Sequence, residues 1–211
     1  MSRISSLPSG LASLPHVAGG WQALRFDWQW QEEMTSSKKN IFLVGMMGSG
    51  KTSIGRALAE RLSMTFIDTD IIIRERTQKS ITKIFREWGE ERFRELERSL
   101  LEEKARENNQ VFSTGGGIVL DKNSRRILRD RGITVLLEAS PRALALRIGN
   151  PTSRPLLKQA KDAKNHLAQI WKEREEAYRS VASLTVSTDE MTHDGAVELI
   201  IRHIRKSREN H

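Results

Sequence analysis

A glycine-rich stretch that ends in lysine, threonine and serine follows an apolar run near residue 45. It reads GMMGSGKTS over residues 45–53 and matches the pattern G-x-x-x-x-G-K-[ST]. Its glycines allow backbone N–H groups to surround a phosphate, and a following helix would add its positive N-terminus. Lys51 would then reach the β- and γ-phosphates, and the Thr52 hydroxyl would ligate Mg²⁺. The sequence therefore predicts a site for the phosphates of a nucleotide.

Two aspartates close the next strand-like run, which reads FIDTD over residues 66–70. If the chain is still extended there, Asp68 and Asp70 project to the same side. Ligands of open α/β sheets lie beyond the carboxyl ends of the strands, so both acids would face that crevice. One carboxylate near Mg²⁺ and one near an acceptor hydroxyl would suit phosphoryl transfer to an alcohol. The alternative interpretation is that Asp70 caps the helix that comes next.

Three successive glycines, residues 115–117, end another strand-like run. They remove all side chains, so a substrate could lie directly on backbone N–H groups, and we favour a ligand surface over a simple turn. A guanidinium could grip a carboxylate or neutralise a transferring phosphoryl group. The residues themselves do not single out Arg94, Arg154 and Arg174 from the other basic positions. Arg94 could equally form a surface ion pair with nearby glutamates.

The segments that must position these side chains alternate between strand and helix patterns. Buried-strand patterns occupy residues 40–45, 64–70, 110–117, 133–140 and 184–188. Helical patterns occupy residues 51–62, 71–77, 80–107, 121–132, 141–149, 166–182 and 194–207. We expect a turn at Gly89, a helix cap at Asp121 and a helix stop at Gly132. The alternation predicts an α/β fold in which a five-stranded parallel sheet is flanked by helices on both faces.

Residues 1–37 differ in composition from the rest of the chain, being rich in Ser, Gly and Pro. Arg3 and several serines give the start some likeness to a targeting peptide, but the apolar core of a secretory signal is missing. A second methionine, Met34, precedes the first strand pattern. We interpret residues 1–37 as a flexible or non-native extension and residues 38–211 as the P-loop domain.

The composition restricts the class of protein. The chain has 211 residues, no cysteine and a net charge of +8. Without cysteine there is no disulfide framework or thiolate metal site, and no apolar run approaches the ~20 residues of a membrane span. The positive charge raises the possibility of nucleic-acid binding. Against it, acidic residues are interleaved with the basic residues, and no aromatic residues are spaced among them to stack on nucleobases. We expect a cytoplasmic monomer with neither a membrane nor a nucleic-acid partner.

The motifs taken together resemble the shikimate kinase family over about residues 38–207. The landmarks, in the family's order and spacing, are GMMGSGKTSIGRALA, FIDTD, GEERFRELE, TGGG, RPLL and REEAY. The resemblance implies a nucleoside-monophosphate-kinase-like fold with a mobile lid at about residues 149–165. It also implies transfer of the ATP γ-phosphate to the 3-hydroxyl of shikimate, giving shikimate 3-phosphate and ADP, within aromatic amino acid biosynthesis. Mg²⁺ would be the cofactor.

The same resemblance implies roles for individual residues. Lys51, Asp70 and the lid residue Arg154 would be catalytic, with Asp70 orienting or deprotonating the acceptor hydroxyl. Asp68 would join Thr52 around Mg²⁺, through water. ATP would be bound by Gly48, Ser49, Gly50, Lys51, Thr52, Ser53, Arg147 and Arg154. Shikimate would be bound by Asp70, Arg94, Gly115, Gly116, Gly117 and Arg174, with the two arginines clamping its carboxylate.

One departure and two alternatives stay open. Some family members place a basic residue near the nucleotide after the last strand, where this chain reads STDEMTHD over residues 187–194, so adenine contacts there are undecided. A related small-metabolite kinase, such as gluconate kinase, is the alternative within the class. A nucleotide-dependent switch or nucleic-acid-binding ATPase is the alternative from another class, and Glu138 would be its candidate for activating water.

Overall fold

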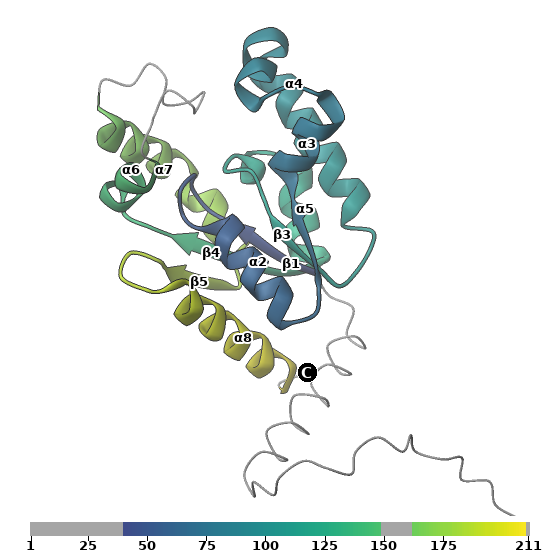
Figure 1. Ribbon diagram of the computed structural model, residues 1–211, viewed down its shortest axis with the longest axis vertical. Helices are drawn as coiled ribbons and strands as arrows, with labels where there is room; N and C mark the ends of the chain where they lie inside the picture. The colour runs from purple at the N-terminus through teal and green to yellow at the C-terminus, as the bar shows by residue number, and fades with distance from the viewer. Residues whose placement is uncertain (1–39, 149–161, 210–211) are drawn as a thin grey trace, which may run out of the picture. The chain divides into compact units, whose positions relative to one another are not determined.

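A parallel five-stranded sheet forms the centre of the domain (Figure 1). The computed structural model describes residues 40–148 and 162–209. The strands are β1 (Asn40–Val44), β2 (Thr65–Asp68), β3 (Gln110–Ser113), β4 (Gly132–Glu138) and β5 (Leu184–Ser187). Their order in the sheet is β2-β3-β1-β4-β5, and each neighbouring pair is parallel. The predicted sheet is therefore confirmed.

Helices connect these strands and cover the sheet. They are α2 (Lys51–Arg61), α3 (Thr69–Thr77), α4 (Ile81–Lys104), α5 (Lys122–Asp130), α6 (Pro141–Ile148), α7 (Ala163–Arg179) and α8 (His193–Glu209), with a short 3-10 turn η1 (Ile118–Leu120). Helix α2 contacts α8, α4 contacts α5, and α6 lies beside α7 (Figure 1). Among the described residues, no helix is long and apolar enough to cross a membrane.

The central strand explains why both faces must be covered. Every residue of β1 is buried, as expected for a parallel strand with helices on either side. Phe42 packs against Phe112 of β3 with the rings tilted by 30° and their centroids 4.8 Å apart, and both belong to the larger core cluster. Leu43 points to the other face, where it comes close to Gly55 of α2. The run at residues 40–44 thus forms the buried central strand, and the glycine-rich loop follows directly from its end.

The second strand ends earlier than the sequence predicts. β2 stops at Asp68, whose carboxylate caps α3 by accepting a hydrogen bond from the Ile71 N–H at 3.1 Å. Asp70 therefore lies in the first turn of α3 and not on an extended strand. The premise that residues 66–70 are all extended was wrong, and the cap is Asp68 rather than Asp70. A carboxylate at this position satisfies a backbone N–H that the helix itself leaves unpaired.

Three further local predictions have definite outcomes. Gly89 breaks α4, with φ 82° and ψ 169°, so the predicted turn is confirmed. Asp121 caps α5 as predicted, since its carboxylate accepts from the Ser124 N–H at 2.8 Å. The helix stops just before Gly132, since α5 ends at Asp130 with Arg131 as its C-cap. Gly132 itself is the first residue of β4, where a Cβ would collide with the Asn40 carbonyl.

Two predicted segments fall wholly or mostly outside the described residues. The extension assigned to residues 1–37 and most of the lid, residues 149–161, lie there. The lid prediction extended to residue 165, but Asp162 caps α7 and residues from Ala163 onward are helical. This helix begins three residues before its predicted start at residue 166.

Candidate active site

The glycine-rich loop between β1 and α2 has the backbone geometry of a phosphate-binding turn. Gly45, Gly48 and Gly50 all have positive φ, which side-chain-bearing residues rarely adopt. Lys51 opens α2, and its ammonium group donates hydrogen bonds of 2.8 Å to the carbonyls of Gly45 and Met46. The loop is thereby closed on itself, with the start of α2 facing a cavity that Gly48, Gly50, Lys51, Thr52 and Ser53 help to line. This agrees with the expected nucleotide-phosphate site.

Three oxygen-bearing side chains meet beside the loop. The Thr52 hydroxyl donates to Asp68 Oδ2 at 2.9 Å and lies 3.2 Å from the Ser113 hydroxyl. Asp68 and Ser113 are paired at the carboxyl ends of β2 and β3. One carboxylate and two hydroxyls suit Mg²⁺, which prefers oxygen and keeps several waters. Sequence reasoning missed Ser113, although its position just before the glycines at a strand end was an available signal.

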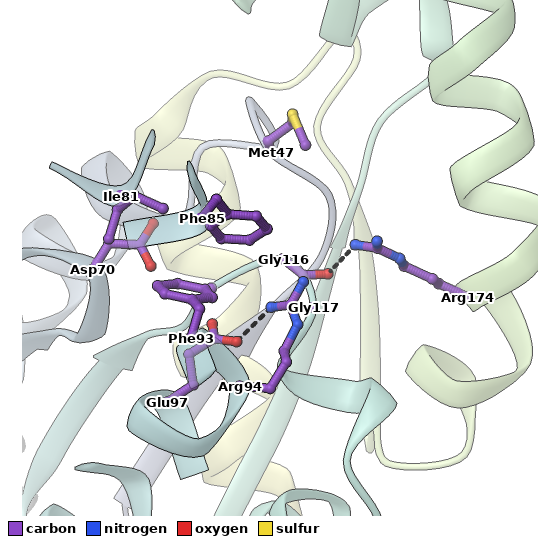
Figure 2. A pocket seen from close by; sticks show the side chains of 11 residues that line it. Met47, Asp70, Ile81, Phe85, Phe93, Arg94, Glu97, Gly116, Gly117 and Arg174 are labelled. Carbon is purple, nitrogen blue, oxygen red and sulfur yellow. Dashed lines mark hydrogen bonds and ion pairs between the residues drawn. The ribbon is translucent and has the colours of Figure 1, made fainter. Parts of the chain in front are cut away.

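A second cavity lies beyond the loop and has a different lining (Figure 2). It is lined by Met47, Asp70, Ile81, Phe85, Phe93, Arg94, Glu97, Gly115, Gly116, Gly117 and Arg174. The predicted acceptor residues are therefore brought together around one space. This cavity shares Met47, Asp70 and Gly116 with the first, so the two adjoin.

The Arg94 side chain lines this second cavity and is held there by several interactions. Its guanidinium donates to Glu90 Oε1 at 2.7 Å and pairs with Glu97. It also lies 5.4 Å from the centroid of the Phe93 ring. A Cβ on Gly117 would overlap the guanidinium, so glycine is required there for Arg94 to take its place. The surface ion pair considered as an alternative is only half right, because the Arg94 side chain is only 18% exposed.

Glu97 is the second functional residue that sequence reasoning missed. Its side chain is 1% exposed, and Oε1 approaches Gly115 so closely that a Cβ there would collide with it. Burial raises the pKa of Glu97 to about 7, with the neighbouring Asp70 adding to the rise and Arg94 opposing it. In the sequence this glutamate lies among many charged helix residues, and no local signal separates it from them.

Arg174 reaches the glycines from the opposite side, on α7 (Figure 2). It is buried, and its guanidinium donates to the Gly116 carbonyl at 3.0 Å. The same carbonyl accepts from the Tyr178 hydroxyl, whose pKa burial raises to about 12. Contacts within the protein also explain the three glycines. Gly115 and Gly117 make room for Glu97 and Arg94, and the Gly116 carbonyl accepts hydrogen bonds from Arg174 and Tyr178.

The remaining nucleotide-side predictions have mixed outcomes. Arg147 of α6 lines the first cavity and donates to the Thr188 hydroxyl at 3.0 Å. Arg154 lies outside the described residues. In the segment where adenine contacts were left open, His193 lines the first cavity at the start of α8. Sequence reasoning did not single out His193, because nothing local relates it to the loop 140 residues earlier.

Comparison of the chain with models of known protein families identifies the family to which these two adjoining cavities belong. The model of the shikimate kinase family matches residues 47–205. The chain belongs to the shikimate kinase family. The match spans α2 to α8 and so includes Lys51, Asp68, Asp70, the three glycines and Arg174. The resemblance predicted from the motifs is confirmed, and the protein is an ATP-dependent small-molecule kinase.

Individual relatives give the same result. A shikimate kinase of Pelotomaculum thermopropionicum is 42% identical over 168 residues, which cover 80% of this chain and 96% of the relative. One from Haemophilus influenzae is 43% identical over 155 residues, covering 74% and 86%. Among solved structures, the shikimate kinase from Acinetobacter baumannii in complex with shikimate is 34% identical with a TM-score of 0.80, covering 84% of this chain and 98% of that one.

Proposed function

We propose that this shikimate kinase family site transfers the γ-phosphate of ATP to the 3-hydroxyl of shikimate, giving shikimate 3-phosphate and ADP. The observation that carries the proposal is the junction of the two cavities at Asp70, Met47 and Gly116. One cavity has the glycine-rich phosphate loop, and the other has two arginines suited to a carboxylate. A donor phosphate and an acceptor hydroxyl would therefore meet beside Asp70.

On the donor side, we propose that the residues of the loop bind ATP as Mg·ATP. The backbone of residues 48–53 would hold the phosphates, and Lys51 would exchange its carbonyl partners for the β- and γ-phosphate oxygens. Thr52 and, through water, Asp68 would hold Mg²⁺, which supplies charge neutralisation at those oxygens. Arg147 would flank the adenine, and Arg154 would close over the phosphates.

On the acceptor side, we propose that Arg94 and Arg174 clamp the carboxylate of shikimate against the glycines. Both guanidinium groups lie at the glycine segment, and a planar guanidinium can grip a carboxylate with two hydrogen bonds. Asp70 would accept a hydrogen bond from the attacked hydroxyl and so aim its oxygen at the γ-phosphate. We retain the cytoplasmic monomer as the proposed state of the enzyme.

An ADP-release assay with Mg·ATP tests this function against its alternatives. Shikimate, gluconate and no acceptor are compared under identical conditions. We expect release of ADP to depend on shikimate and not on gluconate. Hydrolysis that needs no acceptor would favour the nucleotide-dependent switch or ATPase, and stimulation by gluconate would favour the related kinase.

A further inference from the structure

The two carboxylate oxygens of Glu97 have unequal surroundings. Oε2 pairs with Arg94, whereas Oε1 is buried and has no hydrogen-bond partner among the described residues. Oε1 faces the Cα of Gly115, at the point where Asp70 Oδ1 also approaches. A carboxylate that is buried and only half satisfied is costly to keep charged. It is retained here inside the acceptor cavity, at the arginine that would receive the substrate.

The charged groups around Glu97 come from three helices. Arg94 lies on its own helix, Asp70 on α3, and Arg174 and Tyr178 on α7. Burial is the largest cause of the raised pKa, Arg94 and Arg174 oppose the rise, and Asp70 adds to it. With a pKa of about 7, this carboxyl group divides between its charged and neutral forms near neutral pH. Above neutral pH, where Glu97 is mostly charged, the free enzyme can therefore take up most of one proton at this carboxyl group.

We propose that Glu97 takes up a proton from solvent when the carboxylate of the acceptor binds Arg94. The inference rests on the proposed function, because it needs an anionic acceptor at this arginine. The arriving carboxylate competes with Glu97 for the guanidinium donors and adds a negative charge nearby. Protonation of Glu97 removes the repulsion and avoids an unpaired buried charge. Glu97 is therefore a positioning residue, which holds Arg94 in the free enzyme and yields it to the substrate.

The sign of the pH dependence follows from this exchange. Both the new anion and the partial loss of Arg94 raise the pKa of Glu97 further in the complex, so the complex binds more protons than the free enzyme. Affinity for shikimate then falls as pH rises above about 7, by up to about tenfold per pH unit until the pKa of the complex is reached. Below about pH 7 this dependence levels off, because Glu97 is already neutral in the free enzyme.

Calorimetry of shikimate binding to the full chain, without nucleotide, tests the inference. Titrations at pH 7.5 and 8 are compared in phosphate and in Tris, whose different ionisation enthalpies reveal the number of protons bound. We expect the wild type to take up a substantial fraction of one proton. Glu97→Gln should take up none, and its Kd should stay near the low-pH value of the wild type between pH 6.5 and 8.5.

Glu90→Gln is the matched control, since Glu90 pairs with the same guanidinium but its side chain is 47% exposed. This variant should retain the proton uptake.

Binding without uptake in the wild type, or uptake that persists in Glu97→Gln, would overturn the inference and leave the proposed function intact. A Glu97→Gln protein that binds weakly at every pH would also overturn it, because Glu97 would then be an anchor needed in its charged form. Failure of shikimate to bind at all would reject both proposals. The wild-type measurement decides the matter even if the variant does not fold.

Discussion

At the scale of single residues, Lys51 links the glycine-rich loop to the phosphates that the loop would bind. Its ammonium group now bridges the Gly45 and Met46 carbonyls, and phosphates would replace these partners. We predict that Lys51→Ala lowers kcat by at least about 10²–10³-fold, the usual effect of losing one group that stabilises transition-state charge. Shikimate affinity and the circular dichroism spectrum should stay unchanged, because the ammonium group belongs to the nucleotide side. A kcat within tenfold of wild type would contradict the role.

Arg94 should act on binding of the acceptor. Removal of one partner from a desolvated charge pair typically costs ~2–5 kcal/mol, so Arg94→Ala should raise the Kd of shikimate by at least about 30-fold. Glu97 would then lose its counter-charge and become neutral, which protects the fold. Arg98→Ala is the control, because Arg98 lies on the same helix but pairs with Asp121, at 3.4 Å. Equal effects of the two substitutions on the Kd of shikimate would show that Arg94 has no specific role.

The part of the site that the residues alone predict is local in sequence, whereas Arg94 and Arg174 were predicted only through the family resemblance. Lys51 and Thr52 belong to one short pattern, so their neighbourhood could be inferred without a fold. Ser113 and Glu97 lie far from this pattern in the sequence and reach the site through strand register and helix packing. The glycines show the same limit. Their lack of side chains was evident, but the groups that occupy the freed space, Glu97 and Arg94, became visible only in three dimensions.

At the scale of elements, Gly89 separates two parts of α4. Its φ of 82° and ψ of 169° fall in a region that only glycine occupies readily, while a Cβ would meet no atom within 4 Å. Gly89→Ala should therefore act through the backbone and cost about 1–3 kcal/mol. We expect a lower melting temperature, by about 2–4 °C per kcal/mol. The KM for shikimate should also rise, since the preceding residues carry Ile81 and Phe85 to the acceptor cavity.

Glu91→Ala, at an exposed position two residues later in the same helix, is the control for Gly89→Ala. It should change neither the melting temperature nor the KM for shikimate. The KM for ATP should be unaffected by both substitutions, because α4 does not line the nucleotide cavity. A Gly89→Ala protein as stable as the wild type would show that the backbone at residue 89 can adopt a helical conformation without cost.

The elements themselves were predictable because their periodicities are strong. The apolar runs of β1 and β4 are buried in the sheet, and each predicted strand has a counterpart. The prediction was less accurate at the ends of strands and helices, where the strand and the helix compete for the same few residues. The strand pattern was expected to run to Asp70, but Asp68 ends β2 and also caps α3, because the unpaired N–H groups of the helix favour a cap there. Gly132 could end α5 or begin β4, and the close approach of the Asn40 carbonyl explains its place in the strand.

At the scale of the whole molecule, the site depends on elements from both ends of the described chain. The nucleotide side draws on the loop after β1 and on α2, β2, β3, α6 and α8, whereas the acceptor side draws on α4 and α7. Helix α3 contributes Asp70 to both. The two sides meet at Asp70, Met47 and Gly116. Because both linings are carried at the ends of the sheet strands and by the helices that follow, stability of the sheet underlies both halves of the reaction.

The part of the chain that the reaction requires can be predicted from the sheet and these linings. Relatives such as the Pelotomaculum enzyme align with 80% of this chain, and the family match begins at residue 47. The first strand is anchored within the domain, because the Asn40 side chain donates to the Glu107 carbonyl at 2.8 Å and accepts from the Gln110 N–H at 3.1 Å. We predict that a shortened chain beginning at Met34 keeps the kcat, both KM values and the melting temperature of the full chain. A chain beginning at Phe42 lacks these anchors and should melt lower. A large loss of activity on removing residues 1–33 would show that this segment takes part in the reaction or in folding.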